Sequence, residues 1–231
     1  MMSELEIEVL LLSLKIAGWA VLVSLPPGIA IAWLLSRKQF PGKFLLDGLV
    51  HLPLVIPPVA VGYILLLLLG RQGPVGGLLY DLFDVTLVFT WQGAAIAAAV
   101  MAFPLMVRAI RLSLDNVDPK IEAAARTLGA KPGRVFVTIT LPLMMPGILT
   151  GVVLSFARAL GEFGATITFV SNIAGETRTL PIALYTLLQS PGSEDAALRI
   201  VGLSVFLALA ALLVSEVLAR KVSRKLTGTE T

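Results

Sequence analysis

Arg158 and Glu162 are charged residues inside a long and otherwise apolar segment. Four positions apart on a helix, they would share one face, where the guanidinium and the carboxylate can neutralise each other. Charged side chains within apolar segments also mark ion pathways. The pair is therefore either a packing contact or part of a path for a charged solute. Gly161 and Gly164 beside it would let helices approach closely or a gate bend.

The rest of the sequence contains few residues of the types that carry out catalysis. The chain has no cysteine and a single histidine, His51. This excludes disulfides, thiolate metal sites and thiol catalysis, and it leaves a histidine zinc site without enough ligands. A membrane-embedded enzyme would need clustered acids, bases or metal ligands, and Arg158–Glu162 is the main pair. We expect no enzymatic activity, no cofactor and no bound metal.

The composition is typical of an integral membrane protein. Hydrophobic types make up 57% of the 231 residues, charged types make up 14%, and the mean hydropathy is +0.91. About 20 apolar residues are needed to cross a bilayer. We expect an all-α protein that forms one domain over residues 1–231 and contacts the lipid bilayer through five transmembrane helices: Val9–Leu35, His51–Leu69, Leu87–Val107, Leu143–Val170 and Leu198–Ala219.

Prolines interrupt two of these segments. "LPPG" at 25–28 and "LPLVIPP" at 52–58 remove backbone donors, which predicts kinks or interfacial turns. The N-terminal "MMSELEIEV" is acidic where a signal peptide would be basic, so we expect it to be retained.

Basic residues indicate how the segments are oriented. Thirteen of the eighteen Lys and Arg follow the first, third or fifth segment: Arg37, Lys38, Lys43, Arg108, Arg111, Lys120, Arg126, Lys131, Arg134, Arg220, Lys221, Arg224 and Lys225. The positive-inside rule then places the N-terminus outside and the C-terminus in the cytoplasm, with short outer loops at about 70–86 and 171–197. Basic residues placed beside apolar segments are topology signals, so we expect no nucleic-acid partner.

A short helix is predicted over residues 118–130, on the cytoplasmic side. Asp118 is a favourable N-cap, Pro119 suits the first helical position, and Gly129 is placed to end the helix in a left-handed conformation. Pro132 can then begin a second helix. A helix this short is marginal alone in water and needs a surface to pack on.

The same stretch resembles the "EAA … G … I-LP" signature of the membrane subunits of bacterial ATP-binding-cassette importers. The matching positions are Glu122, Ala123, Ala124, Gly129, Ile139, Leu141 and Pro142. The resemblance implies a type I importer permease fold, in which this coupling helix sits in a cleft of a separate ATPase subunit. It places Glu122, Ala123, Ala124, Arg126 and Gly129 at that contact. The chain itself has no GxxxxGK[ST] phosphate loop, since Arg37 stands where the first glycine before Gly42-Lys43 would be.

Four longer stretches look like the molybdate importer permeases: "HLPLVIPPVAVGY" (51–63), "AFPLMVRAIRLSLDNVD" (102–118), "FARALGEFGATITFVSN" (156–172) and "GETRTLPIALYTLLQ" (175–189). The resemblance implies a translocation path for molybdate or tungstate in the inner membrane of a prokaryote, and an extracytoplasmic oxyanion-binding protein as partner. Sulfate permeases share parts of the pattern, so sulfate or another oxyanion is an alternative cargo. A passive channel or scaffold would fit the hydropathy but would leave the cytoplasmic signature unexplained.

Further partners follow from the size of the chain. Five helices offer little room for a closed path, whereas two copies about a two-fold axis would create one and present two coupling helices to two ATPase subunits. We therefore expect a homodimer. The polar outer loop that contains Asn172, Glu176 and Arg178 is the candidate contact for the binding protein.

Overall fold

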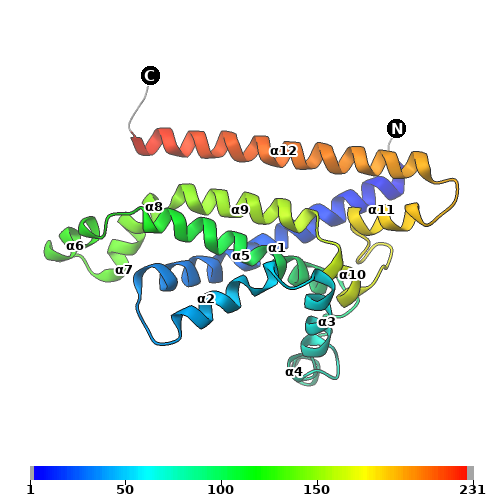
Figure 1. Ribbon diagram of the computed structural model, residues 1–231, viewed down its shortest axis with the longest axis horizontal. Helices are drawn as coiled ribbons and strands as arrows, with labels where there is room; N and C mark the ends of the chain where they lie inside the picture. Colours follow the sequence, from blue (N-terminus) through cyan, green and yellow to red (C-terminus); the bar gives the residue numbers. More distant parts are fainter. Residues whose placement is uncertain (1–2, 228–231) are drawn as a thin grey trace.

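A computed structural model describes residues 3–227 of the chain, with side chains described as far as Val214 and at Val217. Each regular element within that range is a helix, which confirms the all-α prediction (Figure 1). The longer helices are α1 Glu4–Arg37, α2 Lys43–His51, α3 Pro58–Leu69, α4 Pro74–Phe83, α5 Trp91–Asp115, α6 Pro119–Thr127, α9 Met145–Leu160, α11 Leu180–Leu188 and α12 Glu194–Thr227. The shorter ones are η1 Leu52–Leu54, α7 Pro132–Val135, the π-helix η2 Phe136–Thr140, α8 Leu141–Leu143 and α10 Gly164–Val170.

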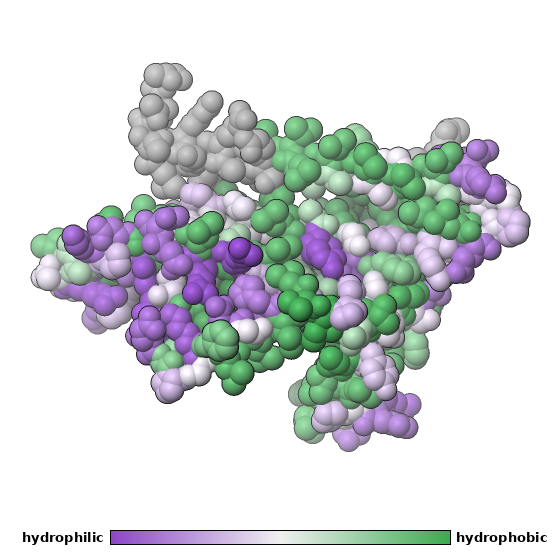
Figure 2. Space-filling model, viewed as in Figure 1, coloured by the Kyte–Doolittle hydropathy of each residue, from purple (hydrophilic) through white to green (hydrophobic). Residues whose placement is uncertain are grey.

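The long helices α1, α5, α9 and α12 run along the long axis of the molecule (Figure 1). The start of α1 and helix α11 lie at one end, α6 and α7 lie at the other, and α3 and α4 project to the side. Hydrophilic side chains gather at both ends, and a mainly apolar surface separates them (Figure 2). Exposed Leu198, Phe206 and Leu213 continue this apolar surface along α12. Such a distribution suits a molecule whose middle lies in lipid.

Alanine allows α1 and α5 to pack closely. Ala17 and Ala20 of α1 are buried in the same cluster as Ala94, Ala97 and Ala98 of α5. Small side chains at a helix interface let the two backbones approach, which is how helices associate in lipid where burial of apolar surface gives no advantage. Helix α1 passes without interruption through Pro26 and Pro27, so an interfacial turn does not occur there.

The predicted second span is sharply bent. Helix α2 and η1 end before Pro57, and α3 begins at Pro58 and leaves at 113° to the preceding pair. The proline-induced break is thus confirmed, and the segment is not one straight helix. Pro57 and Pro58 supply no amide donors there, and the backbone at Pro57 leaves the helical region with ψ of 134°, so α3 starts as a new helix.

The predicted fourth span, Leu143–Val170, has the wrong bounds. Helix α9 ends at Leu160, and α10 starts only at Gly164. The side chain of Glu162 explains this break, since its Oε1 accepts a hydrogen bond from the backbone amide of Ala165 at 2.8 Å. Helix α9 is extended in the other direction instead, by the segment Pro132–Leu143, with a bend of 64°.

The predicted spans Val9–Leu35 and Leu198–Ala219 lie within the continuous helices α1 and α12. The segment expected at Leu87–Val107 becomes helical only at Trp91, because Thr90 caps α5 by accepting a hydrogen bond from the amide of Gly93 at 3.2 Å. Within residues 3–227, three helices are long and apolar enough to cross a membrane alone, and the number reaches five if each bent pair is one span. The loops predicted at about 70–86 and 171–197 contain the helices α4 and α11. The basic residues Arg220, Lys221, Arg224 and Lys225 lie outside the described side chains.

The two broken segments pack against each other through glycine. A Cβ atom added at Gly62 of α3 would lie 2.5 Å from the carbonyl oxygen of Ala165 in α10. One added at Gly164 would lie 2.8 Å from Cβ of Pro58. The starts of α3 and α10 are therefore in contact over their backbones.

Replacement of Gly62 by alanine is expected to separate α3 from α10. The clash is with backbone atoms, which cannot rotate away, so we expect a loss of about 1–3 kcal/mol in stability, as for overpacked interiors. Thermal unfolding of the detergent-solubilised protein measures it. The control is Gly18→Ala in α1, where an added Cβ would meet no atom within 4 Å. Equal unfolding temperatures for the two variants would contradict the close contact.

Candidate functional site

The cytoplasmic helix predicted over 118–130 is α6. Asp118 caps it by accepting a hydrogen bond from the amide of Lys120 at 2.9 Å, and Pro119 occupies the first turn. Gly129 ends the helix with φ of +86°, which glycine adopts without a steric penalty. Pro132 begins α7. These four predictions of local structure are confirmed.

Glu122 is the one buried residue of α6, with 7% of its surface exposed. Its Oε1 accepts hydrogen bonds from Nη2 of Arg37 at 3.1 Å and from the hydroxyl of Thr140 at 3.0 Å. Nη2 of Arg126 is 3.9 Å from Oε2. The carboxylate expected at a partner surface therefore points into its own chain. Arg37 and Thr140 were missed because they are distant in sequence, and no spacing rule connects them to Glu122.

The outward surface of α6 contains small and apolar side chains among the polar residues Lys120, Arg126 and Thr127. Ala123 and Ala124 are exposed, Ile121 is 47% exposed, and Leu128 beyond the helix is 89% exposed. Arg126 and Gly129 are also exposed. An exposed apolar surface beside polar surroundings is typical of a contact with another protein.

The later residues of the signature lie in the segment that contacts α6 through Thr140. Ile139 belongs to the π-helix η2, and Leu141 and Pro142 open α8. Ile139 and Leu141 are half-buried, and Pro142 is exposed. These residues position Thr140, whose hydroxyl reaches Glu122. π-Helical turns occur frequently at functional sites.

The Arg158–Glu162 pair forms, although not on one helix face. Nη1 of Arg158 lies 2.6 Å from Oε2 of Glu162, and Glu162 is 2% exposed. Because α9 ends at Leu160, Glu162 lies in the break rather than on the helix. Its two oxygens connect Arg158 of α9 to the amide of Ala165 in α10. This geometry favours the packing interpretation.

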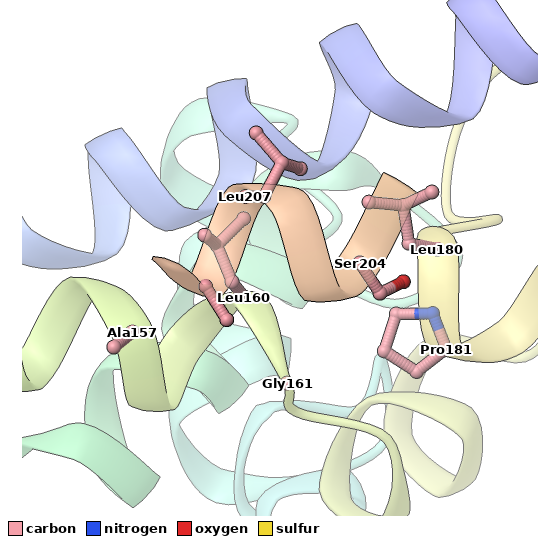
Figure 3. A pocket seen from close by; sticks show the side chains of 8 residues that line it. Ala157, Leu160, Gly161, Leu180, Pro181, Ser204 and Leu207 are labelled. Carbon is pink, nitrogen blue, oxygen red and sulfur yellow. The ribbon is translucent and has the colours of Figure 1, made fainter. Parts of the chain in front are cut away.

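Gly161 opens onto a small cavity between α9, α11 and α12 (Figure 3). The cavity has a volume of about 130 Å³, and Leu160, Leu180, Pro181 and Leu207 contribute to its wall. Its one hydroxyl, that of Ser204, donates to the carbonyl of Ile200. Without a free donor or cation in its wall, this cavity is not suited to an oxyanion. Nor do three or more His, Asp or Glu side chains converge anywhere in residues 3–227 to hold a metal.

The three outer-loop candidates separate into two groups. Nε of Arg178 donates to the side-chain oxygen of Asn172 at 2.8 Å, and the amide of Asn172 donates to Thr186 at 2.9 Å. These two residues stabilise the loop and are half-buried. Glu176 is exposed.

Solved structures share the fold of this chain. The chain superposes on a subunit of the inward-facing MetNI methionine ABC transporter with a TM-score of 0.75 and 16% identity, over 96% of this chain and 99% of that one. A bacterial alginate ABC transporter, in complex with its alginate-bound periplasmic protein, matches with a TM-score of 0.73 and 21% identity, over 99% of this chain and 82% of that one. The fold is that of the membrane-spanning subunit of an ABC importer.

The chain belongs to the family of binding-protein-dependent transport system inner membrane components, whose profile matches residues 24–227. Members of this family are multi-pass proteins of the prokaryotic inner membrane. The molybdenum transport system permease protein ModB of Escherichia coli is 62% identical over 98% of this chain and 99% of its own length. The sulfate transport system permease protein CysW of Synechococcus elongatus is 42% identical over 80% of this chain and 66% of its own length. The molybdate permease resemblance is thus confirmed, and the sulfate permeases are more distant.

Replacing Arg158 by methionine should destabilise the protein by about 1–3 kcal/mol, because the buried Glu162 carboxylate loses its charged partner. The double variant Arg158→Met, Glu162→Gln should recover most of this loss, since the glutamine oxygen still accepts from Ala165. Thermal unfolding of the three variants, the third being Glu162→Gln, gives the coupling between the two residues. Additive effects of the single substitutions would contradict a direct pair.

Proposed function

We propose that this chain is the permease subunit of an ATP-driven importer of molybdate, and that a separate ATPase drives it through α6. The observation that carries the proposal is the outward surface of α6, where Ala123 and Ala124 are exposed while Glu122 is held inside. Small side chains let a partner backbone approach closely. The 62% identity to a molybdenum transport permease over almost the whole chain supports the same cargo.

The proposed orientation has the N-terminus outside and α6 in the cytoplasm. Five spans result if α2–α3 and the bent segment from α7 to α9 each cross once. Two features support this arrangement: α6 lies at the opposite end of the molecule from the start of α1 (Figure 1), and Lys120, Lys131 and Arg134 are exposed near it. These cations suit the cytoplasmic membrane surface.

The proposed assembly contains two permease copies, two ATPase subunits and one extracytoplasmic oxyanion-binding protein. The cavity beside Gly161 is too small and too apolar to serve as the path, so the path would form between two copies. Glu176 would contact the binding protein, and Arg178 and Asn172 would hold its loop in shape. Arg158, Gly161, Glu162 and Gly164 would then form a hinge at the edge of the path.

Neutralisation of Arg158 by Glu162 fits a transporter that must release its cargo. A free cation in the path would bind a dianion too tightly for rapid release, whereas a cation paired at 2.6 Å attracts it weakly. The binding protein then supplies the high affinity for the oxyanion. Sulfate is the rival cargo, and the lower identity to the sulfate permeases makes it the weaker choice.

Reconstitution into proteoliposomes with the cognate ATPase and binding protein tests the cargo. We expect ATP-dependent uptake of labelled molybdate that unlabelled molybdate or tungstate suppresses and equimolar sulfate does not. Liposomes with ADP in place of ATP are the control. Uptake that is independent of ATP would indicate a passive channel, and suppression by sulfate alone would identify a sulfate permease.

Replacement of Ala124 by arginine tests the coupling surface. The added side chain should prevent close approach of the ATPase and cost about 2 kcal/mol, or roughly 30-fold in affinity. Co-purification of the ATPase measures the loss, and the mass of the wild-type complex gives the number of copies. Ala174→Arg, at an exposed alanine of the outer loop, is the matched control and should keep the ATPase bound. Equal co-purification by both variants would place the contact elsewhere, and a mass with one permease copy would exclude the homodimer.

A further inference from the structure

Helix α6 has no apolar side chain buried against the rest of the chain. Its buried residue is Glu122, whereas Ile121, Ala123, Ala124 and Thr127 are exposed. A helix normally transmits force to its neighbours through a packed apolar face. Ala125 is half-buried, and the one buried side chain of α6 is the carboxylate of Glu122, which hydrogen-bonds to Arg37 of α1 and Thr140 of η2.

Arg37 is the residue of α1 that binds the Glu122 carboxylate. It is the last residue of α1, and its side chain is 15% exposed. Its Nη2 donates to Oε1 of Glu122 at 3.1 Å and to the backbone carbonyl of Val117 at 3.0 Å. Val117 is buried in the turn between α5 and α6. One guanidinium nitrogen therefore ties the end of α1 both to the coupling helix and to the covalent connection that leads into it.

Two further hydrogen bonds strengthen the connection between α6 and the long helices. The hydroxyl of Thr140 shares Oε1 of Glu122 with Arg37, which adds the π-helix η2 and, through it, the segment leading into α9. The hydroxyl of Ser36, beside Arg37, donates to Asp115 at the end of α5. Glu122 thereby connects α6 to α1 through Arg37 and toward α9 through Thr140, and Ser36 connects α1 to α5 beside this point.

The geometry leads us to infer that Arg37 is a positioning residue for energy coupling. It holds α6 so that a displacement imposed by the ATPase moves the ends of α1 and α5 together with α9. This inference rests on the proposed function, since it needs an ATPase that moves α6. Without Arg37, α6 keeps its outward surface, its covalent ends and the hydrogen bond from Thr140, so the ATPase can still bind, but its motion is no longer passed directly to the end of α1.

The test is the variant Arg37→Met, which keeps the length of the side chain and removes its donors. Reconstituted with the cognate ATPase and binding protein, it should hydrolyse ATP and retain the ATPase on co-purification. The number of molybdate ions taken up per ATP hydrolysed should fall by about 2- to 30-fold, the range for residues along a coupling route. Thr140→Val should lower the same ratio to a smaller extent, because Arg37 still holds Glu122.

Lys38→Met is the matched control. It removes the same charge from the next position, where the side chain is exposed and lies over the ring of Trp33 rather than near Glu122. It should keep the wild-type ratio. A wild-type ratio in Arg37→Met, or an equal fall in Lys38→Met, would overturn the inference while wild-type coupled uptake leaves the proposed function intact.

A second variant covers the case in which Arg37→Met does not assemble. Arg37→Lys keeps the charge and one contact, but a single ammonium has no planar fork to satisfy Glu122 and Val117 together. We expect it to assemble and to show an intermediate ratio. A full wild-type ratio would show that charge alone suffices and would overturn the positioning role. Absence of any ATP-driven uptake by the wild-type protein would instead refute the proposed function itself.

Discussion

The carboxylate of Glu122 is removed from water, and a charge in such a place must be paired and hydrogen-bonded. Arg37 and Thr140 meet that requirement at 3.1 and 3.0 Å, and in doing so they determine where α6 lies relative to α1 and η2. The outward surface of Ala123 and Ala124 follows from this orientation, since they are exposed only because Glu122 points inward. The Arg37–Glu122 ion pair thus both attaches α6 to its own chain and leaves Ala123 and Ala124 exposed for the proposed contact with the ATPase.

Interruptions in the helices organise the part of the molecule around α3 and α10. Prolines end the helical ladder before α3, and Glu162 caps the break before α10. Broken backbone within a membrane is tolerated where protein covers it. Gly62 and Gly164 provide that cover by bringing α3 and α10 into backbone contact.

Few charged side chains lie between the two hydrophilic ends of the molecule (Figure 2). Arg158 and Glu162 neutralise each other at 2.6 Å, and the cavity beside Gly161 is apolar. An importer that receives its cargo from a separate binding protein has no need of a tight site of its own, and a weak one favours release. The family assignment agrees with a subunit of a transport system.

The sequence by itself determined the helical class, the capping of α6 by Asp118 and Gly129, and the break at Pro57–Pro58, because these depend on hydropathy and on local backbone chemistry. The family was also recognisable from its signature. Tertiary structure alone decided that Glu122 faces inward, because its partners Arg37 and Thr140 are brought to it from distant segments. It also decided the end of α9 at Leu160, since a run of apolar residues fixes how much chain is buried but not where a side-chain carboxylate interrupts the backbone ladder.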